Sequence, residues 1–402
     1  MWLLKFAFRN VLRNKKRSRL TAIAIFVAAM VVAIAMGWVD GLFQVIFESH
    51  IKYQTGNIRI TTENFVKREK FSPVDEILYN SESLSEKIKT IPGVSSVEER
   101  IRFGIILGNG DKTVFAFGVG IDLFKSILNI KEKIIDGKIE DEGIYIGKNL
   151  AKKLNIKIGE DILIASRTSE GGLNGIKLPV KGIFQFNVIT FDDQFFFVSL
   201  KDAKRLLKIP EGTTELLVYT KDYKTAGKVL GTIKSLLSEG EKVMDVKEQL
   251  GSLYDFVEIG KYVYYFFYAI IVFLATFVVI NTMMMAVFER TREIGTLKAM
   301  GLTDREVFIN FIYEGAILGA SGATAGGVVG FLANLILNKT GVNFDFAFQG
   351  ISMPMEYIIR PTADIYVLIV TIIMSTLLTA ISTIFPARRA GKLMPAEALR
   401  KL

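Results

Sequence analysis

The chain has 402 residues, half of them hydrophobic, a net charge of +9, no cysteine and a single histidine. This composition excludes disulfides and thiolate metal sites, and it argues against any triad or zinc site that needs several histidines. The sequence also lacks the G-x-x-x-x-G-K-[ST] pattern of a phosphate-binding loop. We therefore expect no enzyme activity, cofactor or metal in this chain.

Four long runs without a charged residue divide the sequence. They cover residues 20–39, 262–288, 315–338 and 365–387. A helix that crosses a bilayer needs about 20 such residues, so the pattern predicts an α-helical membrane protein with four transmembrane helices. The first run is longer than the core of a secretory signal, roughly 7–15 residues, so a span is favoured over a cleaved leader.

The net positive charge lies on one side of these runs. Residues 1–19 carry +7, residues 289–306 carry 0 and residues 388–402 carry +4, whereas the long segment 40–261 is balanced. Cytoplasmic flanks are rich in Lys and Arg, which predicts a multi-pass protein of the cytoplasmic (inner) membrane with both termini inside. Membrane lipid headgroups, and not nucleic acid, are the expected partner of this charge.

Between the first two runs the pattern becomes that of a mixed α+β domain with two lobes. Residues 55–65 and 215–221 alternate like strands, residues 84–94 and 222–240 have helical spacing, and Gly108 to Asp111 form a hairpin turn. Apolar spacing in residues 40–48 and 246–261 predicts that helices continue from the membrane as a packed stalk. The alternative is that each connection packs on the domain surface.

The complete division of the chain follows from these patterns. It comprises an amphipathic N-terminal helix (1–19), first span and stalk (20–48), extracytoplasmic domain (49–245), stalk and second span (246–288), cytoplasmic loop (289–306), third span (307–338), outward loop (339–364), fourth span (365–387) and cytoplasmic tail (388–402).

The third span is rich in glycine at helical spacing, which allows close helix approach in lipid. The residues predicted to pack in this way are Gly315, Gly319, Gly322, Gly326 and Gly330. Their partner is either a second copy of the chain or a neighbouring helix. Glu314 is embedded near the start of this span, where we expect it to pair with a basic residue or to reach water.

The stretch ERTREIGTLKAMGLT at residues 289–303 predicts a short helix that ends at Gly301, with Thr303 capping the next helix. Its apolar stripe and its charges suit a cytoplasmic docking surface. The residues predicted to dock are Glu289, Arg290, Arg292, Glu293, Ile294, Leu297, Lys298, Met300 and Gly301.

NTMMMAVFERTREIGTLKAMGLTDREV, the tail FPARRAGKLMPAEALR and the strings IPGVSSVEERI and GIYIGKNLAKKLNIKIGEDI resemble the MacB/FtsX/LolE (type VII) superfamily of ABC transporter permeases. The resemblance extends over nearly the whole chain. It implies a MacB-like periplasmic core domain and a dimer with a second copy or a homologous permease. It also implies a separate cytoplasmic ATPase that binds ATP and Mg²⁺ and docks on a coupling helix at 289–300. ATP-driven motion would then reach the outer domain by mechanotransmission.

Lipoprotein release of the LolC/LolE kind is the function that this resemblance favours, because the chain has four spans and lacks a fused nucleotide-binding domain. An FtsX-like regulator of cell-wall hydrolases and a MacB-like efflux permease are the alternatives within the superfamily. From another class, the alternative is a membrane-anchored binding or scaffold protein. The extracytoplasmic partner, a lipoprotein or another protein, stays open.

Overall fold

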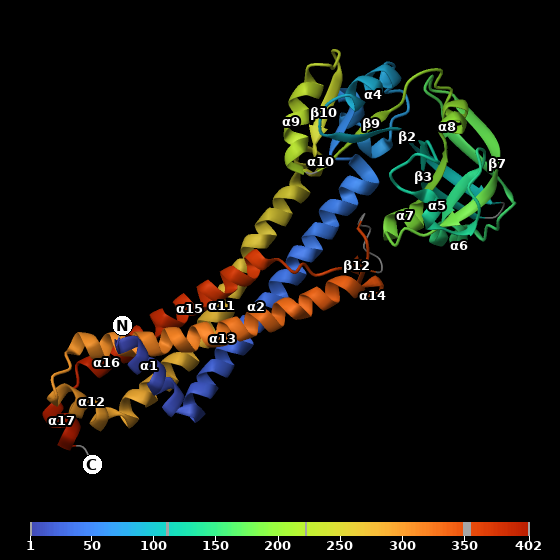
Figure 1. The fold of residues 1–402 in the computed structure, drawn as a ribbon. Coiled ribbons are helices and arrows are strands. Elements are labelled where there is room, and N and C mark those ends of the chain that lie inside the picture. Colours follow the sequence, from blue (N-terminus) through green and yellow to red (C-terminus); the bar gives the residue numbers. More distant parts are fainter. Residues whose placement is uncertain (1, 110–111, 222, 349–354, 401–402) are drawn as a thin grey trace. The chain divides into compact units, whose positions relative to one another are not determined.

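The computed structural model describes residues 2–109, 112–221, 223–348 and 355–400 (Figure 1). The chain divides into two compact units. The helical unit comprises residues 1–43, 256–342 and 359–402, and the mixed unit comprises residues 44–255 and 343–358.

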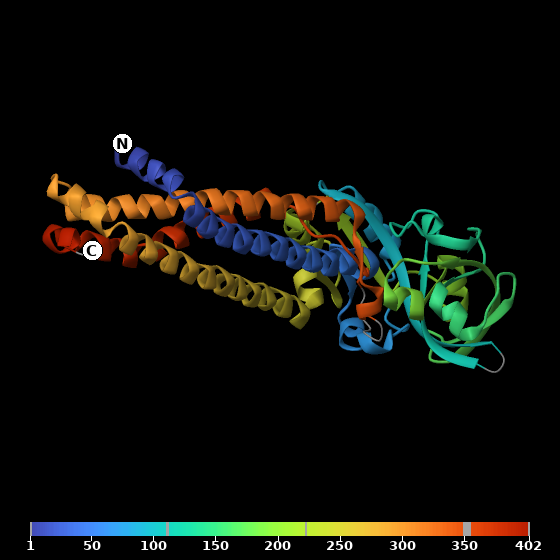
Figure 2. The ribbon, with the colours of Figure 1, turned by 90° about the horizontal axis from the view of Figure 1, so that it is seen from below.

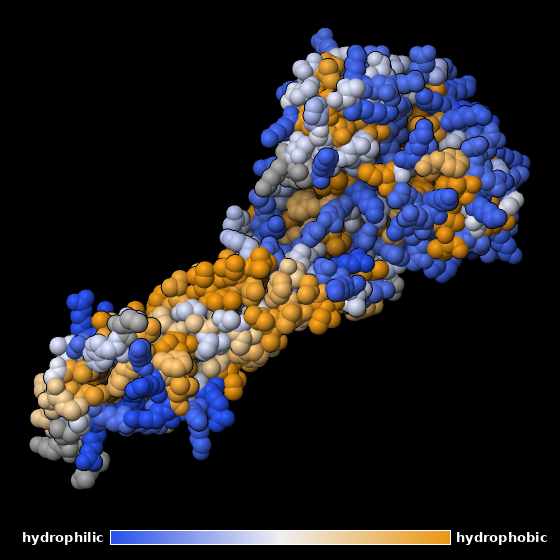
Figure 3. Space-filling model, viewed as in Figure 1, coloured by the Kyte–Doolittle hydropathy of each residue, from blue (hydrophilic) through white to orange (hydrophobic). Residues whose placement is uncertain are grey.

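Long helices run side by side in the helical unit (Figures 1 and 2). They are α2 (Lys15–His50), α11 (Ser252–Glu289), α13 (Asp304–Thr340) and α15 (Ile365–Ser382), which α16 (Ile384–Gly391) continues. Among the described residues, four helical segments are long and apolar enough to cross a membrane. Apolar side chains cover these helices, and hydrophilic ones gather near the end that carries α1 (Trp2–Arg13) (Figure 3).

Helix α1 is amphipathic, as the sequence predicted. Trp2, Leu4, Phe8 and Leu12 are each about half exposed, whereas Ala7 is buried against the rest of the unit. A helix with an exposed apolar face beside a basic one is suited to lie in the lipid headgroup region.

The glycines of α13 contact helices of the same chain. A Cβ atom at Gly315 would overlap the side chain of Thr383, and one at Gly319 would lie 2.9 Å from that of Thr379. Further along, Gly322, Gly326 and Gly330 meet α2 between Ala22 and Ile34. The sequence did not show whether these glycines pack against a second copy of the chain or against a neighbouring helix. In the structure they pack against neighbouring helices of the same chain.

The mixed unit is built on a ten-stranded sheet in the order β10-β1-β9-β2-β3-β8-β5-β7-β4. Strand β6 pairs with both β2 and β7, which closes β2, β3, β8, β5, β7 and β6 into a ring. The first part of β2 pairs with β9, so this long strand joins the ring to an open sheet. The strands are β1 (Ile58–Thr62), β2 (Val94–Asn109), β3 (Lys112–Ile121), β4 (Ile134–Gly137), β5 (Ile144–Gly147), β6 (Asp161–Arg167), β7 (Leu173–Phe184), β8 (Phe195–Ser199), β9 (Glu215–Thr220) and β10 (Glu241–Asp245).

Each lobe has its own core because its strands alternate between buried and exposed residues. In β6, for example, Ile162 and Ile164 point into the ring while Asp161 and Leu163 face outward. Ile88 and Ile233, from the helices that flank the open sheet, pack with its strands. The helices are η1 (Ile51–Thr55), α3 (Glu63–Lys67), η2 (Glu69–Phe71), α4 (Ser81–Lys89), α5 (Ile130–Lys133), α6 (Lys148–Leu154), α7 (Ile189–Gln194), α8 (Leu200–Leu207), α9 (Tyr223–Lys234), α10 (Val246–Leu250) and α14 (Asp345–Phe348).

The elements predicted for this unit are found as β1, β9, α4 and α9. The predicted hairpin is found as well, because Asn109 pairs with Lys112 across β2 and β3. Gly110 and Asp111, at its expected turn, lie outside the described residues.

The two connections between the units differ in continuity. Helix α2 runs unbroken to His50, whereas the second connection breaks at Gly251, which has a φ of +49° between α10 and α11. The predicted helical continuation is therefore interrupted there, because glycine readily leaves the helical conformation. The aromatic rings of Phe47 and Tyr254 lie 5.6 Å apart, so the two connections do contact each other.

The described residues 343–348 and 355–358, after α13, belong to the mixed unit. The two-residue strands β11 (Val342–Asn343) and β12 (Ile358–Ile359) pair with each other. The Tyr53 hydroxyl donates to the Glu356 carboxylate at 2.7 Å, and the Tyr357 hydroxyl donates to Asn187 Oδ1 at 2.7 Å. Glu356 and Tyr357, which precede the fourth long helix, are thus hydrogen-bonded to other parts of the mixed unit.

His50 makes the mixed unit sensitive to acid. Burial and the nearby Arg59 guanidinium lower its pKa to about 4, and neither ring nitrogen has a hydrogen-bond partner within the described residues. The unfolded chain takes up a proton near pH 6.5 and the folded chain only near pH 4. The stability that the neutral ring contributes is therefore complete above pH 6.5 and is lost as the pH falls towards 4.

We expect His50→Gln, which stays neutral at every pH, to remove this part of the acid sensitivity. The measurement is the unfolding midpoint of the wild type and the variant at pH 7 and pH 5. The wild type should lose more stability between the two; equal losses would show that His50 is not the group responsible.

Candidate docking site around helix α12

The short helix predicted between the second and third spans is α12 (Thr291–Ala299). Gly301 follows it with a φ of +106°, a conformation that favours glycine. Thr303 then caps α13, since its hydroxyl accepts from the Glu306 N–H at 3.3 Å and the Glu306 carboxylate accepts from the Thr303 N–H at 2.9 Å. The short helix, its glycine stop and the following cap are confirmed.

The inner side of α12 is buried in the chain itself. Ile294 is 3% exposed and belongs to an apolar cluster with residues of α11, α13 and α16. A Cβ atom at Gly295 would lie 2.6 Å from Ala398 Cβ, so α17 (Pro395–Arg400) packs directly on this helix. The predicted docking stripe needs a correction here, because Ile294 fills the protein's own core and cannot contact a partner in this conformation.

A buried polar network joins α12 to two other helices. Glu314, 2% exposed, accepts hydrogen bonds from Arg290 at 3.0 Å, Asn10 at 2.7 Å and Asn310 at 2.9 Å. These partners come from the start of α12, from α1 and from α13 itself. Charged groups are rarely buried unless they are paired and hydrogen-bonded, and this carboxylate is both. The predicted pairing of Glu314 with a basic residue is confirmed.

The sequence predicted Arg290 as a docking residue, but in the structure it is an internal residue. It is 6% exposed, its guanidinium lies 5.7 Å from the centre of the Phe311 ring, and its Nε contacts Glu293 at 3.2 Å. Glu293 also forms an ion pair with Arg13 of α1. The basic N-terminal helix is therefore bound to α12 through Glu293 and to α13 through Glu314.

Lys298 fastens the other end of α12. Its ammonium donates to the carbonyl oxygens of Gly391 at 2.7 Å and Leu393 at 2.6 Å, and it pairs with Asp304 at 2.7 Å. These bonds join the helix to the segment before α17 and to the start of α13. Lys298 is thus a structural residue as well as a predicted docking residue.

The remaining docking candidates lie on the outer side. Met300 is 70% exposed, Arg292 is exposed and Leu297 is half-buried. Glu289 is also exposed, with its carboxylate 3.4 Å from Arg17. Fewer of the predicted residues are therefore available to a partner than the sequence indicated. Met300 is the most exposed apolar side chain among them. That a partner docks on this face stays a prediction.

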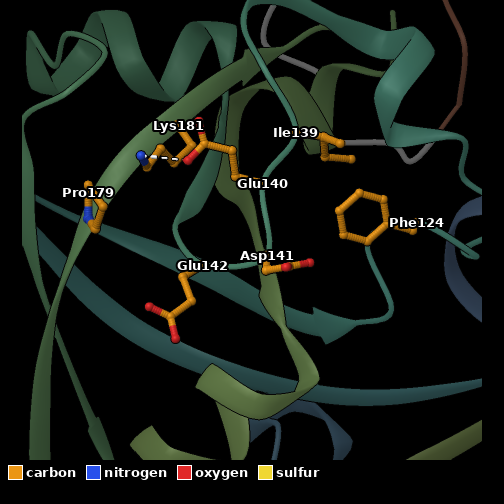
Figure 4. A pocket seen from close by; sticks show the side chains of 7 residues that line it. All are labelled: Phe124, Ile139, Glu140, Asp141, Glu142, Pro179 and Lys181. Carbon is orange, nitrogen blue, oxygen red and sulfur yellow. Dashed lines mark ion pairs between the residues drawn. The ribbon is translucent and has the colours of Figure 1, made fainter.

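A cleft in the mixed unit is the alternative place for a site (Figure 4). It measures about 620 Å³ and is lined by Phe124, Ile139, Glu140, Asp141, Glu142, Pro179 and Lys181. Its acids are exposed, and the Glu140 carboxylate is paired with Lys181 at 2.7 Å. Within the described part of the chain, no group of three or more His, Asp and Glu residues is arranged to hold a metal ion. We assign no chemistry to this cleft.

Two known protein families match this chain. The family model for the MacB-like periplasmic core domain matches residues 18–236, and that for the FtsX-like permease C-terminal domain matches residues 265–395. The chain is an ABC transporter permease of the MacB/FtsX/LolC family. The first match covers more than half of the permease, and the second includes α12 and Glu314.

The permease is similar to proteins from both bacteria and archaea. It is 26% identical over 296 residues to the lipoprotein-releasing system transmembrane protein LolC of Neisseria meningitidis, covering 69% of this chain and 70% of that one. It is 27% identical over 422 residues, 99% of this chain and 97% of the relative, to an uncharacterised ABC transporter permease of Methanocaldococcus jannaschii. The periplasmic region of MacB from Actinobacillus actinomycetemcomitans aligns with a TM-score of 0.36 at 13% identity, covering 49% of this chain and 91% of that structure.

The superfamily resemblance and the fold class predicted from the sequence are thereby confirmed. The permease has four apolar helices suited to span a membrane and a MacB-like α+β domain inserted between the first and the second. The sequence did not reveal Asn10 and Asn310 as partners of Glu314. An asparagine inside an otherwise apolar helical stretch was the available signal.

Proposed function

We propose that this permease couples ATP hydrolysis by a separate cytoplasmic ATPase to movement of its MacB-like domain, and that the movement releases lipoproteins from the membrane. The ATPase binds ATP and Mg²⁺ and docks on the outer side of α12. The permease acts as a dimer with a second copy or a homologous permease. Similarity to LolC proteins, whose names state lipoprotein release, supports the choice of cargo.

The observation that carries this proposal is the way α12 is bound into the helical unit. Its outer side exposes Met300 and Arg292, while Arg290 ties its start to Glu314 inside α13. A push on the outer side therefore moves α13 directly. The glycines of α13 are in close contact with α2 and α15, so the motion is transmitted as a rigid-body shift between packed helices.

A MacB-like efflux permease with a separate ATPase is the second candidate. The match of residues 18–236 to the MacB-like core domain favours it. Both candidates need the same docking step, so the first experiment tests what they share.

We expect Met300→Ala together with Leu297→Ala to weaken ATPase binding about 30-fold or more, because apolar interface anchors are worth about 2 kcal/mol or more. Arg292→Ala should weaken it by a factor of about five or less, as is usual for exposed charges. Binding is measured by titrating the partner ATPase against permease in nanodiscs, together with the stimulation of ATP hydrolysis. Unchanged binding and stimulation in the double variant would contradict docking on α12.

Met285→Ala is the matched control for this experiment. Met285 is 62% exposed and lies in the apolar part of α11, so its truncation removes a similar side chain away from α12. Binding should be unchanged. ATP hydrolysis by the purified permease alone would contradict the proposal that a separate ATPase hydrolyses ATP.

The proposed orientation can be tested with single cysteines, because the chain has none. Leu173, in the mixed unit, is 88% exposed, and Thr296 is exposed on α12. In intact cells, Leu173→Cys should react with a membrane-impermeant thiol reagent, and Thr296→Cys should react only after lysis. The reverse pattern would place both termini outside and rule out docking of a cytoplasmic ATPase on α12.

A further inference from the structure

A cavity of about 610 Å³ lies between α2, α11 and α15 inside the helical unit. This volume falls in the range of about 300–1,000 Å³ that is typical of small-molecule sites. Its wall is apolar and includes Val32, Met36, Val272, Val370, Met374 and Leu378. Its polar lining consists mainly of two carboxylates and three tyrosines, namely Asp40, Asp364, Tyr265, Tyr268 and Tyr366.

The charged residues around this cavity lie at one depth of the membrane. Asp40 directly follows the first apolar run, and Lys261 and Asp364 directly precede the second and the fourth. A charge-free run of about 20 residues matches the hydrocarbon core, so all three residues lie at the level of the lipid headgroups. The apolar wall extends from that level into the hydrocarbon. The cavity is therefore polar where a lipid is polar and apolar where a lipid is apolar.

Two polar groups of the lining form no hydrogen bond with any other described residue. Tyr268 is 8% exposed, and its hydroxyl is buried without a hydrogen bond to any described residue. Asp40 is half-buried and forms no hydrogen bond or ion pair within the described part of the chain. A buried polar group without a hydrogen bond costs about 1–3 kcal/mol, so the Tyr268 hydroxyl favours a ligand that can bond to it.

The polar lining of the cavity favours a ligand with a positively charged group. Asp40, Asp364, Tyr265, Tyr268 and Tyr366 all line this cavity, so two carboxylates and three aromatic rings surround the same space. Carboxylates and tyrosine ring faces both attract an ammonium group. The Lys261 ammonium lies over the Phe43 ring, 5.6 Å from the ring centre, and attracts the Asp40 carboxylate without forming an ion pair with it.

We propose that this cavity binds one membrane phospholipid whose headgroup carries an ammonium. The ammonium lies between Asp40 and Asp364 within reach of the Tyr268 hydroxyl. The adjacent phosphate faces Lys261, and an acyl chain lies along the apolar wall. The site is independent of the cargo and of the ATPase.

The test measures lipid binding to the purified, delipidated permease in detergent by native mass spectrometry. Phosphatidylethanolamine and phosphatidylglycerol with identical acyl chains are added separately. We expect one tightly bound phosphatidylethanolamine and a preference of about tenfold over phosphatidylglycerol, roughly the effect of one charge-assisted hydrogen bond. Asp40→Asn with Asp364→Asn should abolish the preference. Asp255→Asn, at an exposed acid in the first turn of α11, should keep it.

Ala269→Trp gives a second measurement that does not alter the charges. Ala269 lines the cavity, so the indole should fill the space of the acyl chain and weaken binding of phosphatidylethanolamine about tenfold or more. The unfolding midpoint in lipid-free detergent shows that each variant is folded. Equal binding of the two lipids by the wild type, a preference unchanged by the double substitution, or binding of phosphatidylethanolamine unchanged by Ala269→Trp would each overturn the proposal.

Discussion

Arg290→Ala is expected to lower the free energy of unfolding of the permease by about 3–5 kcal/mol, because it leaves the Glu314 carboxylate buried without its cation. The side chains of Arg290 and Glu314 are 7% and 2% exposed, and their closest atoms are 3.0 Å apart. Asn10 and Asn310 still donate hydrogen bonds to the carboxylate, but they carry no charge to balance it. The measurement is reversible unfolding in mixed micelles with increasing denaturing detergent.

Glu289→Gln is the matched control, since it removes one partner of an exposed pair. Glu289 is 59% exposed and lies 3.4 Å from Arg17, so its loss should change stability by no more than about 1 kcal/mol. Replacement of both buried partners, Arg290→Met with Glu314→Leu, should restore most of the stability, because no unpaired charge remains. If Arg290→Ala proves as mild as Glu289→Gln, the network does not hold α12 to α13.

The double replacement also separates stability from coupling. If the bond between Arg290 and Glu314 transmits the motion of α12, a stable permease without it should bind the ATPase and respond weakly to ATP. A normal response would show that the other links from α12 to α13, the apolar packing of Ile294 and the Lys298–Asp304 ion pair, suffice to transmit the motion.

The sequence predicted the membrane spans and the short helix because these depend on local patterns. A run without charges, a glycine after a helix and a threonine three residues before a glutamate each act within a few neighbouring positions. The burial of Ile294 and Arg290 depends instead on α13, α16 and α17, which follow later in the chain. An exposed and an internal apolar stripe have the same spacing, so periodicity alone could not distinguish them.

Local sequence patterns also could not predict that strands of the mixed unit close into a ring. The strands β2 and β6 pair although Ile106 and Ala165 are far apart in the chain, and β7 then closes the ring through β6. The sequence indicated strands and two lobes, but it contained no signal for which edges meet. The cavity between α2, α11 and α15 was hidden for the same reason, since its residues come from three separated segments.

Gly326→Ala is expected to destabilise the helical unit by about 1–3 kcal/mol, even though alanine favours a helix over glycine by about 1 kcal/mol. The new Cβ would overlap the carbonyl oxygen of Phe26 and lie 3.0 Å from the Met30 nitrogen. Both are backbone atoms of α2, so no side-chain rotation relieves the contact and α2 must move away from α13. The measurement is the free energy of unfolding in the same mixed micelles.

Gly327→Ala, one residue further along α13, is the matched control. Its Cβ would lie 3.0 Å from Leu368 Cδ1, the end of a flexible side chain that can rotate away. The gain in helix propensity should then offset the contact, leaving stability within about 1 kcal/mol of the wild type. Since α2 continues unbroken from this contact to His50, Gly326→Ala should also reduce the response to ATP more than Gly327→Ala does. Equal effects of the two substitutions would mean that α13 tolerates a side chain against α2, and close glycine packing could not be what carries motion between these helices.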